Sequence, residues 1–282
     1  MSTPRIGLAL GGGGARGLAH VPVIEAFDDL GLVPHAVAGT SIGAIFGAGY
    51  AGGLSGEDLR AVSEETFRDR NAVLARLWKL RPRRIGDLFG SPGPLQFDAA
   101  KVLEHFVGPH FPADFADLKI PLTIIATDYF SCCEAKLTSG PLHPAIAASM
   151  AIPALFKPVM LDGRVMVDGG LVNPLPFDAL PDDLDIVVAS DVIGAPIPRK
   201  GRNVPGASDA AFGATQILMQ SINLEKLKNR RPDILVKPDI AGYRVLDFLK
   251  TDKILAAAEP MRDMVKREIA AAIETFEARR AG

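Results

Sequence analysis

Residues 6–17 have the sequence IGLALGGGGARG and residues 36–51 have the sequence AVAGTSIGAIFGAGYA, and these two stretches decide the fold. Each begins with a short apolar run, passes through glycines and leads into a segment whose apolar residues recur at helical spacing. Glycine lacks a Cβ atom, so it permits tight turns and close approach of the backbone. Of the 28 glycines, 14 lie in the first 56 residues, which indicates a site built largely from backbone groups.

Both stretches are predicted to form a strand, a turn and a helix. In the first, a buried strand over Ile6–Leu10 precedes a helix over Leu18–Leu30. In the second, a strand over Ala36–Ala38 precedes a helix over Ala44–Ala51 made of small residues that can pack close to a sheet. Further along the chain, the run Ile186–Ala189 is apolar on both faces, as expected of a central strand in a parallel sheet.

The glycines of the first unit match the spacing of a dinucleotide-binding fingerprint, Gly12-x-Gly14-x-x-Gly17. That site also needs an acidic residue at the end of the second strand, where it binds a ribose. The second strand here ends in Gly39-Thr-Ser41, and the nearest acids, Asp28 and Asp29, lie inside the preceding helix. The sequence therefore disfavours a nicotinamide cofactor, and no cofactor is expected.

The second unit has the form of a nucleophile elbow, Gly39-x-Ser41-x-Gly43. A sharp turn from strand to helix lifts the serine above the sheet edge, and the small flanking residues let the backbone pass. Amides at the start of the helix favour developing negative charge. Ser41 is therefore the candidate nucleophile.

A serine hydroxyl needs a neighbouring base, because it is a weak nucleophile at neutral pH. A Ser–acid–His triad of the α/β-hydrolase kind places its histidine late in the chain, but none follows His143 here. A carboxylate is thus the expected base. Asp168 before Gly169-Gly170 is one candidate, although an Asp-Gly pair is also typical of a simple turn. Asp128 and Asp191, which also end predicted strands, are its rivals.

The whole chain, residues 1–282, is expected to form a single α/β domain with three layers, α/β/α, around a mostly parallel sheet. Its motif-bearing core spans residues 6–189, and a mainly helical part, 209–282, packs on it. The last helix keeps a 3.6-residue period with a break at Pro260. Further strands are predicted at Leu122–Ala126, Arg164–Val167, Ile186–Ser190 and Ile234–Val236.

Composition narrows the function classes. The net charge is −2 and the pI is about 6.2, so the basic excess of a nucleic-acid binder is missing. The two cysteines are adjacent, Cys132 and Cys133, and supply neither a disulfide framework nor a metal cage. No metal site is expected. We expect a reducing, cytoplasmic location, since neither a signal peptide nor a spanning helix is visible.

One stretch suggests contact with a membrane surface. Residues 78–84 carry the only tryptophan, Trp78, together with four cations that end at Arg84. Such a segment can dock on anionic lipid, or it can be a solvated loop between helices.

The chain resembles the patatin-like phospholipases in the residues of its motifs and in their order along the chain. The likeness extends over residues 6–189 and includes Ala148–Pro158, which looks like the family's Ala-Ser…Ile-Pro…Phe-x-Pro segment. Two departures are visible: Ala154 stands where the family usually has glycine, and the patch Ser131–Cys133 could alter an acyl pocket. The matching blocks are the glycine-rich loop Gly12, Gly13, Gly14, Arg16 and Gly17, the elbow Gly39, Ser41 and Gly43, and the triplet Asp168, Gly169 and Gly170.

The resemblance implies a patatin-like fold and a serine lipid acyl hydrolase that works with a Ser41–Asp168 dyad. Backbone amides of Gly12, Gly13 and Gly14 would form the oxyanion hole, and Arg16 would anchor that loop or face a phosphate. The implied substrate is a phospholipid or another acyl ester. The alternative is a non-catalytic lipid-binding or regulatory protein on the same fold, and a homodimer formed through the final helix stays open.

Overall fold

The computed structural model describes residues 3–71, 73, 96–106, 108–197 and 204–281. Within these ranges an eight-stranded sheet runs in the order β5-β6-β3-β2-β1-β7-β8, with β4 also paired to β3. The pairs β3–β2, β2–β1, β1–β7 and β7–β8 are parallel, so the expected mostly parallel α/β architecture is confirmed. The strands are β1 Ile6–Leu10, β2 Ala36–Thr40, β3 Leu122–Asp128, β4 Cys133–Leu137, β5 Val159–Leu161, β6 Arg164–Asp168, β7 Ile186–Ser190 and β8 Ile234–Val236.

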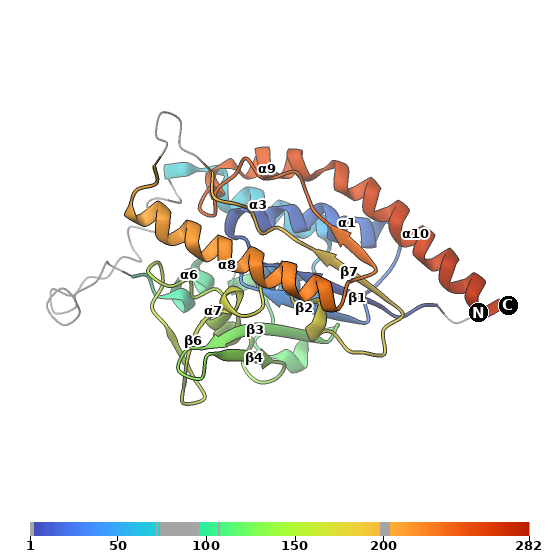
Figure 1. Cartoon of the computed structure of the whole chain (residues 1–282), viewed down its shortest axis with the longest axis horizontal. Helices are drawn as coiled ribbons and strands as arrows, with labels where there is room; N and C mark the ends of the chain where they lie inside the picture. The colour runs from blue at the N-terminus through green and yellow to red at the C-terminus, as the bar shows by residue number, and fades with distance from the viewer. Residues whose placement is uncertain (1–2, 72, 74–95, 107, 198–203, 282) are drawn as a thin grey trace, which may run out of the picture.

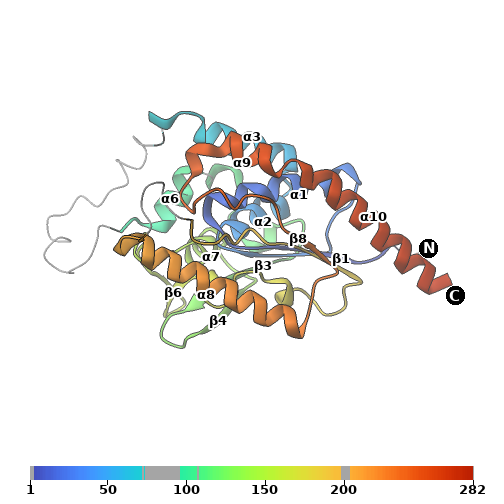
Figure 2. The same cartoon turned by 45° about the horizontal axis from the view of Figure 1, so that its top comes forward.

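Helices cover both faces of the sheet (Figure 1). Turning the molecule shows α1, α3, α9 and α10 on one side and α8 on the other (Figure 2). The described α-helices are α1 His20–Asp29, α2 Ile42–Gly52, α3 Gly56–Arg68, α6 Ala99–Phe106, α7 Leu142–Ser149, α8 Ala207–Asn229, α9 Thr251–Ala258 and α10 Pro260–Ala281.

The two faces carry cores of very different size. Side chains alternate across a strand, so Leu8 and Leu10 join a large core with α1, α2 and α7, while Ala9 points to the opposite face. There the sheet presents mainly alanine, covered by Phe177 of a short 3₁₀ turn, Phe177–Ala179, and by Leu227 of α8. α8 also contacts the 3₁₀ turn Gly169–Leu171, which directly follows β6.

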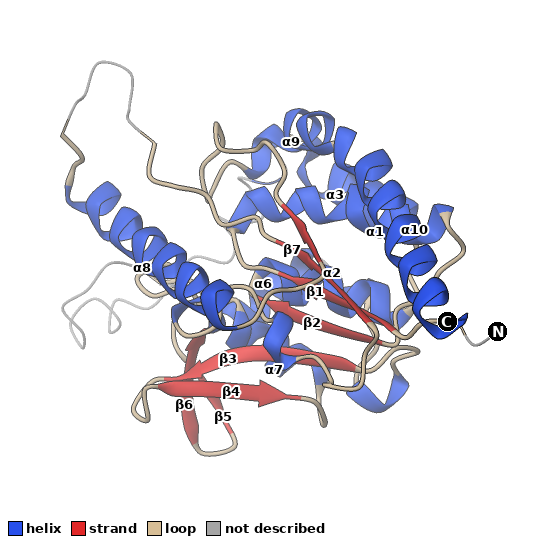
Figure 3. Cartoon of the chain, turned by 45° about the vertical axis from the view of Figure 1, so that its right-hand side comes forward, coloured by secondary structure: helices blue, strands red, loops and turns tan. Residues whose placement is uncertain are grey.

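Local structure follows the sequence in most places. The break at Pro260 is confirmed, because α9 ends at Ala258 and α10 begins at Pro260. At the first position of a helix the N–H has no partner within the helix, so proline loses no hydrogen bond there. The first helix differs from expectation: a 3₁₀ turn over Gly14–Ala19 comes first, and α1 starts only at His20. The antiparallel strands β4 and β5 were not expected; they gather beyond β3 at one side of the sheet (Figure 3).

The edge of β3 explains how two distant segments meet. One edge of β3 pairs with β4 over residues 124–128. On its other edge, residues 122–125 pair with β2 and residues 126–128 pair with β6. The two strands approach from opposite directions: Thr40 of β2 lies opposite Ile125, and Asp168 of β6 lies opposite Ala126. The ends of β2 and β6 therefore meet at neighbouring positions of β3, which brings Ser41 next to Asp168.

Candidate active site

Ser41 occupies a sharp turn between β2 and α2. Its backbone has φ 55° and ψ −119°, a conformation that L residues rarely adopt. The glycines beside it are required by close approach, since a Cβ on Gly39 would lie 2.5 Å from the Gly43 carbonyl oxygen and one on Gly43 would lie 2.1 Å from that of Leu10. The Ser41 amide donates to Ser149 Oγ at 2.8 Å, and that hydroxyl donates to the Ile125 carbonyl at 2.5 Å.

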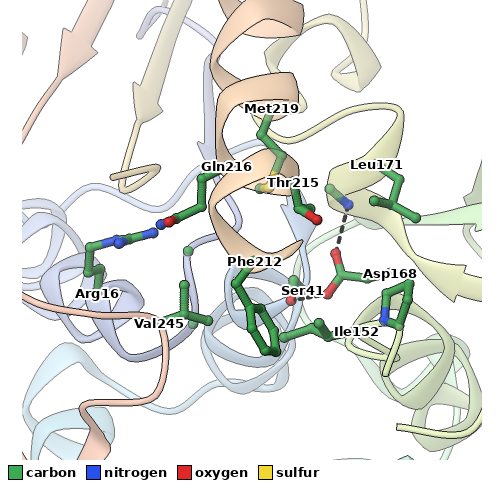
Figure 4. Close-up of a pocket in the computed structure, with 14 residues that line it drawn as sticks. Arg16, Ser41, Ile152, Asp168, Leu171, Phe212, Thr215, Gln216, Met219 and Val245 are labelled. Carbon is green, nitrogen blue, oxygen red and sulfur yellow. Dashed lines mark hydrogen bonds between the residues drawn. The ribbon is translucent and has the colours of Figure 1, made fainter. Parts of the chain in front are cut away.

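The Ser41 hydroxyl donates to Asp168 Oδ2 at 2.6 Å, and the Gly170 amide donates to Asp168 Oδ1 at 2.8 Å (Figure 4). Both Ser41 and Asp168 are 6% exposed. Burial raises the pKa of Asp168 to about 6, against the opposing effect of its hydrogen bonds from Ser41 and Gly170. The carboxylate is thus still ionised at neutral pH and accepts a proton more readily than an exposed aspartate does.

The rival carboxylates have other partners. Asp128 accepts from the Ser131 amide at 3.2 Å and lies 4.0 Å from Arg164. Asp191 accepts from the Ile193 amide at 3.1 Å and lies 3.7 Å from Lys237.

The glycine loop passes directly beside the dyad. Gly13 and Gly14 line a small pocket of about 50 Å³ together with Ser41 and Asp168. The loop fits tightly, since a Cβ on Gly13 would lie 2.4 Å from the Val192 carbonyl oxygen, while Gly14 has φ +60°. One expectation needs correction: the Gly12 amide donates to the Pro174 carbonyl at 2.9 Å, so it is engaged by the fold and does not face the site as a free donor.

Arg16 is buried and bonds to protein groups on several segments. Its Nε donates to the Val192 carbonyl at 3.1 Å, and one terminal nitrogen donates to that of Tyr243 at 3.2 Å. With its carboxamide oxygen turned toward the guanidinium, Gln216 of α8 accepts at 2.9 and 3.0 Å, and the two side chains face one another in Figure 4. Burial lowers the pKa of Arg16 to about 10. These contacts favour the anchor role over a phosphate-binding role. The next glycine, Gly17, packs directly on Ile42 of α2.

A second, larger cavity of about 420 Å³ also reaches Ser41. It extends between α2, α3 and α6, and its lining is almost entirely apolar, for example Ile45, Val62 and Phe106. The segment after α7 contributes Met150, Ile152, Leu155 and Phe156, whereas α7 itself is mostly buried in the core. The two cavities share Gly14, Ser41, Ile152 and Val245.

Some contributors were not identified from the sequence. Ser149, whose hydroxyl accepts from the Ser41 amide, stood in the Ala148–Pro158 motif, but no role was assigned to it. Four residues of α8 that line the small pocket carry no motif: Phe212, Thr215, Gln216 and Met219. The only signal was the lack of charge in α8 between Asp209 and Glu225. The Ser131–Cys133 patch lies at the β3–β4 turn with both cysteines exposed, and Cys132 has φ 53°.

Residues 78–84, the expected lipid-docking stretch, lie outside the described residues. Across the described ranges, no helix is both long and apolar enough to cross a membrane. Nor do the described residues contain three or more His, Cys, Asp or Glu side chains grouped so that they could hold a metal ion.

Comparison with known proteins identifies the class. The profile of the family described as patatin-like phospholipase matches residues 8–181, and the chain belongs to that family. An uncharacterized NTE family protein of Mycobacterium tuberculosis is 34% identical over 195 residues, 69% of this chain and 51% of that protein. Patatin-like phospholipase domain-containing protein 7 of Rattus norvegicus is 28% identical over 277 residues, 88% of this chain and 20% of that protein.

The chain therefore spans about half of the length of the first relative and about a fifth of the second. Among solved structures, VipD from Legionella pneumophila has a similar fold, with a TM-score of 0.51 at 12% sequence identity, over 96% of this chain and 67% of VipD.

Proposed function

We propose that this protein is a serine carboxylic ester hydrolase that acts on lipid acyl esters through a Ser41–Asp168 dyad. The 2.6 Å hydrogen bond from the Ser41 hydroxyl to the buried Asp168 carboxylate carries the proposal. It pairs a nucleophile with a base at the distance that proton transfer requires. Membership of the patatin-like phospholipase family supports a lipid substrate.

The reaction proceeds in two halves. Ser41 Oγ attacks the ester carbonyl carbon while its proton passes to Asp168 Oδ2, and the tetrahedral intermediate then expels the alcohol, which takes that proton from Asp168. An acyl-enzyme on Ser41 remains. Water attacks the acyl carbon as Asp168 accepts its proton, the carboxylic acid leaves, and the proton returns to Ser41 Oγ.

The developing oxyanion is bound by backbone amides of the glycine loop. Gly13 and Gly14 line the pocket beside Ser41, and with the Gly12 amide bonded to Pro174 we assign the donor role to these two glycines. Removing one oxyanion donor commonly lowers kcat by about 10²- to 10³-fold, so this loop contributes to the rate as an integral part of the site.

The two cavities divide the substrate between them. The apolar cavity of about 420 Å³ accepts the acyl chain, because burying its methylene groups there removes them from water. The small pocket beneath α8 faces the leaving alcohol, next to Thr215 and Gln216.

Labelling with a fluorophosphonate probe, combined with hydrolysis of p-nitrophenyl esters, tests the proposal. Wild-type protein should be labelled and should turn over, whereas Ser41→Ala should lose both and Asp168→Asn should lose most of both. Ser131→Ala, at the exposed β3–β4 turn, is the control for a serine substitution. Labelling that survives in Ser41→Ala would place the nucleophile elsewhere, and a folded wild type that is neither labelled nor active would favour the non-catalytic lipid-binding alternative.

A further inference from the structure

His20 is a buried histidine that the dyad does not use. It is the first residue of α1 and is fully buried. Its Nε2 lies 2.9 Å from the Gly11 carbonyl oxygen, and its Nδ1 lies 2.9 Å from Ser190 Oγ. A carbonyl can only accept, so Nε2 carries the hydrogen, and Nδ1 of a neutral ring accepts from the Ser190 hydroxyl.

The ring is neutral under ordinary conditions. Burial lowers the pKa of His20 to about 4, and this effect exceeds the opposing one of the Gly11 hydrogen bond. The imidazole is thus a fixed donor toward Gly11 rather than a group that exchanges protons during the reaction.

The Gly11 carbonyl belongs to the peptide unit from which the glycine loop departs. The other end of that unit, the Gly12 amide, donates to the Pro174 carbonyl at 2.9 Å. The peptide plane is therefore held on both sides, by His20 and by Pro174. The Gly11 amide adds a third hold, through its 3.0 Å hydrogen bond to the Ser190 carbonyl.

The far end of the loop is held as well. The Ala15 amide donates to the Val245 carbonyl at 2.7 Å, and Arg16 is bonded to Val192 and Tyr243. Between these two ends lie Gly13 and Gly14. Glycine resists rotation of its neighbouring peptides least of all residues, so the direction in which these amides point depends on how the ends are held.

On the basis of the function proposed above, we propose that His20 is a positioning residue for the oxyanion loop. Its imidazole holds the Gly11 carbonyl, and thereby orients the peptide units that present the Gly13 and Gly14 amides to the reacting carbonyl.

Two conservative variants separate this role from simple packing. In His20→Gln the amide nitrogen reaches as far as Nε2 and can still donate to Gly11. In His20→Asn it reaches only as far as Nδ1, on the Ser190 side. We expect His20→Gln to keep most of the wild-type kcat on a p-nitrophenyl ester, and His20→Asn and His20→Phe to lose about 10²-fold in kcat with KM unchanged.

The rate of fluorophosphonate labelling should follow kcat, because the phosphoryl oxygen of the probe occupies the same oxyanion position. His35→Phe is the matched control. Its Nδ1 accepts from the Ile6 amide at 3.2 Å, at the other end of the same strand β1, so its removal should leave kcat unchanged.

Thermal unfolding is measured for every variant, and the comparison of Gln with Asn still decides if His20→Phe does not fold. Equal kcat in His20→Asn, His20→Gln and wild type would overturn the role, and so would equal losses in Gln and Asn that follow their loss of stability. A wild type that neither labels nor turns over would instead contradict the proposed function, which keeps the two failures apart.

Discussion

At the scale of single residues, Asp168 gains its basicity from burial. Its carboxylate is enclosed by the ends of β2 and β6, and only two hydrogen bonds, from Ser41 and Gly170, offset the loss of water. The pKa is raised to about 6, which lies between an ordinary aspartate and an ordinary histidine. In the proposed mechanism, this single carboxylate takes the role of base that a histidine has in many serine hydrolases.

The proposed mechanism predicts how activity depends on pH. If Asp168 is the base, it must be ionised, so kcat/KM should rise with pH through about 6 and then level off. Below that midpoint it should fall about tenfold for each pH unit. The profile is measured with a p-nitrophenyl ester from about pH 4.5 to about pH 8, after a check that the protein stays folded throughout. Full activity at the acid end would show that Asp168 is not the base.

The candidate site residues differ in how far the sequence alone could predict them. Ser41 could be predicted as the nucleophile from its own motif, because the strained turn needs glycine on both sides. Asp168 could be chosen over Asp128 and Asp191 only through the family resemblance, since all three end strands. The antiparallel entry of β6 onto β3, which brings Asp168 to Ser41, is a long-range pairing without a local signal. The Gly12 amide was expected to be an oxyanion donor but donates to the Pro174 carbonyl. Residue type alone does not determine how a peptide plane is oriented, so the sequence could not predict this.

At the scale of elements, α2 shows how closely the elbow helix must approach the sheet. It contains two buried glycines one turn apart, Gly43 and Gly47. A Cβ on Gly43 would meet the backbone oxygen of Leu10 at 2.1 Å, whereas one on Gly47 would meet only side-chain atoms of Val37 and Leu122, at 3.2 and 3.3 Å.

Alanine at these two positions should therefore act differently. Gly43→Ala should lower the melting temperature strongly and abolish labelling of Ser41, because the helix must move away from β1. Gly47→Ala needs only small side-chain shifts, and the higher helix propensity of alanine, worth about 1 kcal/mol, offsets part of their cost. Calorimetry and labelling of both variants check this, and equal behaviour would contradict the close-approach argument.

The apolar cavity between α2, α3 and α6 leads to a second prediction at this scale. Val62 of α3 lines it, so Val62→Phe should fill part of the space. Hydrolysis of p-nitrophenyl palmitate should fall while that of the acetate stays unchanged, since a short chain does not reach α3. Val33→Phe makes the same change at a position that is 68% exposed and serves as control. Equal loss on both esters would mean that the cavity does not hold the acyl chain.

α8 lines the small pocket beside Ser41, and local sequence patterns could not predict that position. Its helical character was predicted as part of the mainly helical stretch 209–282, and the observed helix is Ala207–Asn229. Its position beside the dyad depends on contacts far along the chain, such as Gln216 with Arg16 and Lys226 with the Leu175 carbonyl. The backbone conformation of Ala154 was likewise not predicted from the sequence. Ala154 stands where the family usually has glycine, and its φ of 68° lies in the left-handed region that glycine adopts without strain.

At the scale of the whole molecule, the segment after residue 206 is joined to the rest of the chain by strand pairing and by ion pairs. β8 extends the sheet beside β7, and α10 packs along α1. Glu25 of α1 is 4% exposed and accepts from Arg60 of α3 through both oxygens at 2.7 Å, while Arg262 of α10 lies 3.3 Å away. Arg60 also reaches Glu259 at 2.7 Å, so one network joins three helices.

If residues 1–282 form one domain, this network should stabilise the whole chain as a unit. Arg60→Met leaves Glu25 buried with only the longer contact to Arg262, and should lower the free energy of unfolding by about 2 kcal/mol, less than for a fully orphaned buried charge. Urea unfolding followed by circular dichroism should keep a single transition with an unchanged slope, shifted to lower urea. Arg230→Met, which removes an exposed pair with Asp182, should leave the midpoint in place. A separate early transition in Arg60→Met would instead show that the C-terminal helices unfold on their own. Specific ester hydrolysis per folded molecule should stay at the wild-type level, because the dyad is held by β2, β3 and β6 rather than by this network.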